Sequence, residues 1–197
     1  PQYELDQVAL PGLDTAVAPD PENFRDSFGL LPGEVINSDR IIAAQTRLDV
    51  AMAENGYPFA ETGEPALEID HAERKGDLAL TVTPGGKYNF GSIFMEQTDL
   101  FGPDHVQMIA RFDPGDIYQA SDLEDLRRAL IATGLVSTIS IDPVVAEDPD
   151  AVDIAVDVTA APLRTIAGEL GYGTGEGARA AVSWEHRNFF PPEGLIR

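Results

Sequence analysis

The sequence predicts an α+β fold in which two similar units, each of the order β-α-α-β-β, are followed by a pair of strands. A proline-glycine-acid segment recurs near residues 32 and 114, and each copy is followed by a glycine suited to ending a helix, Gly56 or Gly134. Charge supports the same division: residues 1–86 and 87–161 are strongly acidic, whereas residues 162–197 carry four acidic and four basic side chains. We therefore expect three segments, 1–86, 87–161 and 162–197.

Six short runs of apolar and β-branched residues predict the strands of the two units. The clearest run lies late in the second unit, where Val152, Ile154 and Val156 alternate with small or acidic residues, as in a half-buried strand. The predicted strands are Tyr3–Leu10, Ala66–His71 and Leu78–Thr83 in the first unit, and Tyr88–Glu96, Val136–Asp142 and Val152–Thr159 in the second.

The main helix of the second unit has both a start signal and an apolar stripe. Ser121 and Glu124 have the spacing of a capping box, which satisfies unpaired N–H groups at a helix start. The stripe, at helical spacing, consists of Leu123, Leu126 and Leu130. A shorter helix is expected over residues 104–111.

The main helix of the first unit follows the same plan. Asn37 or Ser38 is the expected N-cap, and Gly56 can adopt the left-handed conformation that ends a helix. A shorter helix is expected over residues 21–30. The predicted apolar stripe of the main helix consists of Ile41, Ala44, Leu48 and Ala51.

The last segment predicts two amphipathic strands of about ten residues, a length and pattern typical of transmembrane barrel strands. Residues 174–177 are the expected turn between them. Because two strands leave unpaired backbone groups, we expect this tail to pair with another copy of the chain or to extend a sheet of one of the units. The apolar face consists of Ile166, Gly168, Leu170 and Tyr172 on one strand and Ala180, Val182 and Trp184 on the other.

The composition argues against several classes of function. A formal net charge of −21 disfavours binding to nucleic acid, which needs clustered Lys and Arg. The sequence has no cysteine, no nucleophile elbow and no paired-histidine zinc motif, so we expect no catalytic residue, no metal and no cofactor. The acidic loop formed by Glu147, Asp148 and Asp150, with Asp153 nearby, leaves a Ca²⁺- or ligand-binding module as an alternative from another class.

Three segments of the second unit resemble the POTRA (polypeptide-transport-associated) domain next to the barrel in TamA-like proteins of the BamA superfamily. They are Lys87-Tyr88-Asn89-Phe90-Gly91, Phe112-Asp113-Pro114-Gly115-Asp116-Ile117-Tyr118 and Thr133-Gly134-Leu135-Val136. The tail segments Gly171–Thr174 and Trp184–Phe189 resemble the opening strands of the family's surface-antigen barrel. The resemblance implies two tandem POTRA domains followed by the first strands of a truncated outer-membrane β-barrel, whose remainder we expect beyond Arg197.

The resemblance also implies the strand order within each unit: first, third, second. The second strand is then an open edge that can accept an extended segment by β-augmentation. The second unit's edge has the more favourable composition, whereas Glu68 and Asp70 suggest protection of the first edge against indiscriminate pairing. The predicted binding residues are Ala66, Leu67, Glu68 and Ile69 on one edge and Val136, Ser137, Thr138, Ile139, Ser140 and Ile141 on the other.

This resemblance implies a protein of the bacterial outer membrane whose POTRA domains lie in the periplasm. Its expected partners are unfolded outer-membrane or secreted proteins and a TamB-like protein anchored in the inner membrane. It would bind clients without covalent chemistry and pass them to the barrel. The POTRA region of a two-partner secretion transporter is the alternative within the same fold.

Overall fold

The structure is a computed structural model that describes residues 2–95, 102–162, 164–173, 177–190 and 194–196. The chain separates into two compact units. The first runs to Phe90 and adds Pro114–Ser121 and Ala146–Val152; the second consists of Gly91–Asp113, Asp122–Val145 and the chain from Asp153 onward. Among the described residues, no helix is both long enough and apolar enough to cross a membrane.

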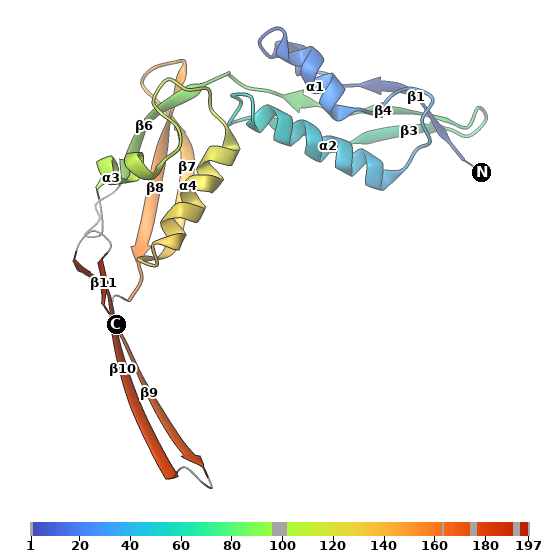
Figure 1. Cartoon of the computed structure of the whole chain (residues 1–197). Helices are drawn as coiled ribbons and strands as arrows, with labels where there is room; N and C mark the ends of the chain where they lie inside the picture. Colours follow the sequence, from blue (N-terminus) through green and yellow to red (C-terminus); the bar gives the residue numbers. More distant parts are fainter. Residues whose placement is uncertain (1, 96–101, 163, 174–176, 191–193, 197) are drawn as a thin grey trace. The chain divides into compact units, whose positions relative to one another are not determined.

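The first unit is built on a three-stranded sheet of the order β1-β4-β3. Strand β1 (Glu4–Ala9) runs parallel to β4 (Lys75–Ala79), and β3 (Ala66–Asp70) runs antiparallel to β4. Helices α1 (Asp20–Phe28) and α2 (Ser38–Ala53) lie along one face of the sheet (Figure 1). The order expected from the resemblance, with the second predicted strand at the edge, is confirmed.

Helix α2 begins and buries its stripe largely as predicted. The Asn37 side chain accepts a hydrogen bond from the Arg40 N–H at 3.1 Å, so Asn37 is the N-cap. Gly56 has φ 98°, the left-handed conformation expected after this helix. Met52, rather than the predicted Ala51, completes the buried stripe with Ile41, Ala44 and Leu48.

The predicted third strand, Leu78–Thr83, is wrong in its bounds. Strand β4 begins at Lys75 and ends at Ala79, and β5 (Val82–Thr83) pairs instead with β2 (Glu61–Thr62). A Cβ atom added at Gly76 would lie 2.7 Å from Ile36 Cδ1 and 2.9 Å from Ile69 Cδ1, so a larger residue would make these two side chains shift. Glycine inside a strand marks such a close approach, although its polar surroundings suggest a turn.

The sheet of the second β-α-α-β-β repeat has the order β6-β8-β7. Its strands are β6 (Asn89–Met95), β8 (Ala151–Ala160) and β7 (Val136–Val145), and its helices are α3 (Pro103–Ile109) and α4 (Ala120–Ala132). The predicted second strand is again an edge. The core contains the three leucines predicted on α4 together with Val152, Ile154 and Val156 of β8.

The start of α4 differs from the predicted capping box. The helix begins at Ala120, so Ser121 lies inside its first turn. The Ser121 N–H and hydroxyl donate to the two carboxylate oxygens of Glu54 at 2.8 and 2.6 Å. The Glu54 carboxylate, distant in sequence, thus accepts the Ser121 N–H in place of the Glu124 carboxylate. Glu124 instead forms an ion pair with Arg127 at 3.3 Å.

The tail forms a separate sheet of the order β11-β10-β9, which corrects the expectation that it extends one of the other sheets. Strands β9 (Arg164–Gly173) and β10 (Gly177–Phe190) pair antiparallel over their whole overlap, and β11 (Gly194–Ile196) adds to β10. The hairpin pairs the inner backbone groups of β9 and β10 with each other, and the outer side of β9 has no strand partner among the described residues. Residues 174–176 of the expected turn lie outside the described residues.

Candidate binding edges

The first open edge is β3, which carries the predicted residues Ala66, Leu67, Glu68 and Ile69. Its neighbour β4 lies on one side only, so the backbone on the other side has no strand partner among the described residues. Ala66 and Glu68 are exposed, Leu67 is 36% exposed and Ile69 is half-buried. The structure therefore brings these four residues together at one accessible edge.

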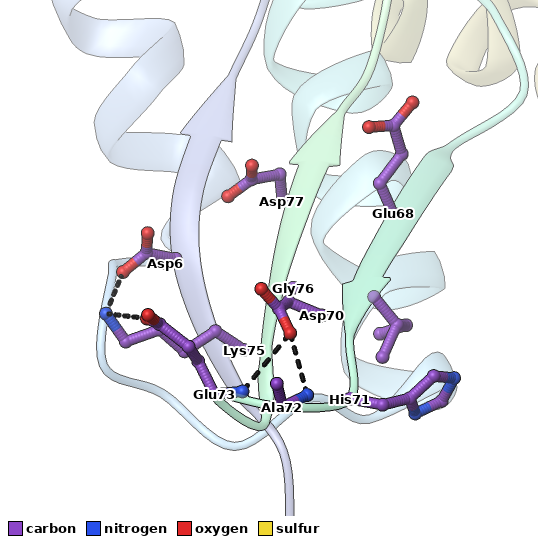
Figure 2. A pocket seen from close by; sticks show the side chains of 10 residues that line it. Asp6, Glu68, Asp70, His71, Ala72, Glu73, Lys75, Gly76 and Asp77 are labelled. Atoms are coloured by element: carbon purple, nitrogen blue, oxygen red, sulfur yellow. Dashed lines mark hydrogen bonds and ion pairs between the residues drawn. The ribbon is translucent and has the colours of Figure 1, made fainter.

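The β3 edge borders an acidic hollow of about 520 Å³ on the sheet face (Figure 2). Lys75 projects into it from β4 and binds Asp6 on β1, with a distance of 2.7 Å between Nζ and Oδ1. The hydrogen bond to Asp6 raises the pKa of Lys75. The acidic residues that line the hollow are Asp6, Glu68, Asp70, Glu73 and Asp77.

Asp70 at the end of β3 shapes the turn that leads into β4. Its Oδ1 atom accepts the N–H groups of Ala72 and Glu73 at 2.7 and 3.2 Å. These backbone hydrogen bonds, with that of Glu73 the stronger cause, lower the pKa of Asp70. The Asp70 carboxylate thus stabilises the turn between β3 and β4. This turn includes Arg74, which has φ 58°.

Glu68 and Asp77 stand directly opposite each other on β3 and β4. Within the part of the chain that the structure describes, neither makes a hydrogen bond or an ion pair. Like charges opposite each other on neighbouring strands are destabilising, by up to about 1 kcal/mol. This edge therefore keeps two negative charges that no described side chain neutralises by direct contact.

The second open edge is β7, which carries all six predicted residues. In the part of the chain that the structure describes, β8 is its neighbour on one side and no strand lies on the other. Ser137, Thr138 and Ser140 are exposed, Val136 and Ile139 are half-buried, and Ile141 is buried. The Ser137 hydroxyl lies 3.2 Å from the carbonyl oxygens of Thr159 and Ala160 on β8. The β7 edge is thus uncharged over these six residues, as predicted.

Arg127 on α4 contacts this edge, and sequence reasoning did not find it. Its Nη1 atom donates to the main-chain carbonyl of Ile139 at 3.1 Å, and its Nε atom donates to Glu124 at 3.3 Å. Leu135, just before β7, accepts the N–H of Ala161 at 2.7 Å on the β8 side of this strand. Main-chain groups of residues two apart point to the same side, so the Ile139 carbonyl also faces β8, and Arg127 ties α4 to the paired side of β7. No local sequence signal links these two residues, because the contact arises from packing of α4 on the sheet.

The alternative Ca²⁺ site in the acidic loop gains no support from the geometry. Asp148 accepts the N–H of Asp150 at 3.0 Å, and Asp153 accepts the N–H of Ser92 at 2.7 Å. These carboxylates stabilise a turn and an adjacent strand. Within the described ranges, no group of three or more His, Asp or Glu side chains is arranged to hold a metal ion.

No protein-family model matches the sequence. Two solved structures of BamA are similar to the chain. BamA from Haemophilus ducreyi lacking POTRA domains 1–3 matches 95% of the chain with a TM-score of 0.74 and 16% identity. Haemophilus influenzae BamA POTRA domains 3–5 match 93% of the chain with a TM-score of 0.66 and 12% identity. The chain has the fold of POTRA domains.

The POTRA fold predicted from residues 87–136 is thereby confirmed. This chain spans 35% of the length of the Haemophilus ducreyi structure and 96% of the Haemophilus influenzae one. The similarity is one of fold, and the narrower assignment to TamA-like proteins stays a prediction.

Proposed function

We propose that the chain is the periplasmic POTRA region of an outer-membrane protein assembly or translocation factor of the TamA-like kind. Its two POTRA sheets bind extended polypeptide segments, from unfolded outer-membrane or secreted proteins or from a TamB-like partner, and pass them toward a barrel. One observation carries the proposal: in both sheets the second strand has a neighbour on one side only among the described residues.

An open edge suits this class of client. An added strand gains main-chain hydrogen bonds, which depend little on sequence, while side-chain contacts give selectivity. An unfolded outer-membrane protein is a series of alternating strands that lack partners, so it offers many such segments. The role is binding and templating, without covalent chemistry.

The tail supports placement next to a barrel. The apolar face of the β9–β10 hairpin is open to solvent: Ile166 is 75% exposed, Leu170 is 88% exposed and Val182 is 81% exposed. Strand β9 has ten residues, within the roughly 9–11 that a tilted strand needs to span a membrane. We infer that residues 162–197 include the first strands of a barrel and that this face contacts lipid.

The proposal is tested by removing a backbone donor from an edge. Residues two apart on a strand direct their main-chain groups to the same side, so Ser137 faces β8 as Leu135 does, and the Thr138 N–H lies on the open side. Thr138→Pro removes that donor, whereas Thr138→Ala keeps it and controls for the lost side chain.

The measurement is the affinity of the folded full chain for a urea-unfolded outer-membrane protein diluted into buffer. We expect Thr138→Pro, but not Thr138→Ala, to weaken binding about fivefold. Circular dichroism checks that both variants fold. Equal affinity of the two folded variants, or no binding by the parent chain, would contradict the proposal.

A further inference from the structure

We propose that the β3 edge selects extended segments in which a lysine or arginine stands between two apolar residues. The inference rests on the proposed function, because it concerns which extended segments this edge accepts. It follows from the different chemistry of the two faces that meet along β3.

The alternation of β3 sets the pattern that a partner strand must match. Glu68 and Asp70 lie on the face with the acidic hollow (Figure 2). Leu67 and Ile69 alternate with them and stand opposite the buried Leu78 and Gly76, on the other face. A strand added beside β3 places successive side chains on these same two faces. Its residues therefore stand next to an acidic surface and an apolar surface in turn.

On the acidic face, an added strand gains most from a positively charged side chain. Lys75 binds Asp6, and Asp70 holds the turn. Glu68 and Asp77 are the carboxylates of this face that make neither a hydrogen bond nor an ion pair among the described residues, so an added strand would meet them there. A residue opposite Glu68 on an added strand would place its Cβ atom about 5 Å from that of Glu68. The long side chain of lysine or arginine also extends toward Asp77, one strand of about 4.8 Å farther on.

On the other face of β3, an added strand gains most from apolar side chains. Leu67 is 36% exposed at the rim and Ile69 is half-buried beside it. Apolar residues on either side of the basic one would cover these two side chains and remove their surface from water. The combination predicts an apolar-basic-apolar triplet as the core of the segment.

This inference differs from simple protection of an edge. Carboxylates that only block pairing would weaken the binding of every strand. Carboxylates that select would weaken binding of acidic segments and strengthen binding of basic ones, more so at low ionic strength.

The experiment titrates the full chain with three nine-residue peptides in which valine alternates with lysine, serine or glutamate. Amide hydrogen exchange of residues 66–70 reports binding at β3. We expect the lysine peptide to bind there about tenfold more tightly than the serine peptide, and the glutamate peptide to bind most weakly.

Glu68→Gln combined with Asp77→Asn should reduce the preference for lysine to less than about twofold. The matched control, Glu22→Gln with Asp26→Asn, removes two exposed charges from α1 and should keep the preference. This control separates local recognition from attraction by the net charge.

The inference is overturned if lysine and serine peptides protect residues 66–70 equally, or if the preference survives in the Glu68/Asp77 variant. Failure of the proposed function gives a different result: none of the three peptides protects residues 66–70 or 136–141.

Discussion

Strands β3 and β7 occupy the same position in their sheets, and among the described residues each has a neighbouring strand on one side only. Strand β3 has five residues, and its Glu68 stands opposite Asp77 of β4, whereas β7 has ten residues, of which the first six are uncharged. Charge at an open edge reduces its tendency to pair without selection. The difference teaches that two edges at the same place in one fold can differ in the electrostatic selection they exert.

The two edges should respond differently to salt. A cationic side chain neutralises Glu68 and Asp77, so salt and charge variants should act at β3. Strand β7 is uncharged over residues 136–141, so binding there should change little with ionic strength.

The largest effect is expected from truncating the core under one sheet. Leu48 on α2 is fully buried, so Leu48→Ala should lower the free energy of unfolding of the first unit by about 2–5 kcal/mol. Peptide protection at residues 66–70 should then weaken while protection at 136–141 remains. Leu130→Ala on α4 is the reciprocal control, and hydrogen exchange measures both. Loss of both edges in either variant would show that they are not separate sites.

Alkaline pH should destabilise the first unit selectively. Burial, followed by the 2.7 Å hydrogen bond to Asp20, raises the pKa of Tyr57 to about 12. Burial, with a smaller effect of the Glu54 carboxylate, likewise raises the pKa of Tyr118 to about 12. Both tyrosines belong to the first compact unit. Because an unfolded tyrosine ionises near pH 10, this stability is complete below pH 10 and is lost between about pH 10 and 12.

The predicted loss is about 2–3 kcal/mol for each tyrosine. Tyr57→Phe should remove its share of the pH dependence, but should cost about 1–2 kcal/mol at neutral pH, because Asp20 and the Val17 N–H each lose a partner. Urea unfolding at a series of pH values measures both effects. An unchanged slope between pH 10 and 12 in this variant would contradict the assignment.

A smaller effect is expected at the β7 edge. Arg127→Ala removes the hydrogen bond that ties α4 to the Ile139 carbonyl and should speed amide exchange at residues 136–141 about fivefold, with no change at residues 66–70. Arg127→Lys keeps the charge and is the control for electrostatic effects. Hydrogen exchange measures both edges, and unchanged exchange at residues 136–141 in the alanine variant would show that this contact does not support the edge.

The sequence predicts the order of elements and both edges because these depend on local patterns and on the family resemblance. The alternation of Val152, Ile154 and Val156 marks a strand wherever it packs. The bounds of β4 could not be predicted, since Gly76 and its polar neighbours suggest a turn, and only the folded structure packs the Ile36 and Ile69 side chains against this glycine. The same holds for Arg127 on Ile139 and for Glu54 on Ser121, because only tertiary packing brings these pairs together.

The smallest effect is expected in the turn beside the β3 edge. Arg74 has φ 58°, a left-handed conformation that strains any residue with a Cβ atom. Arg74→Gly should raise the free energy of unfolding of the first unit by about 0.5–1 kcal/mol and leave peptide binding at both edges unchanged. Thermal unfolding measures the first effect, and a destabilised variant would show that the Arg74 side chain stabilises the hairpin.

The most direct test of the central claim is an isotope-filtered NMR experiment on the full chain bound to an unlabelled valine-serine peptide. Strand addition predicts nuclear Overhauser effects between peptide backbone protons and the backbone protons of residues 66–70, of residues 136–141, or of both. Contacts of a bound peptide only with side chains, or only with helices α2 and α4, would contradict the claim that these edges bind clients through their backbones.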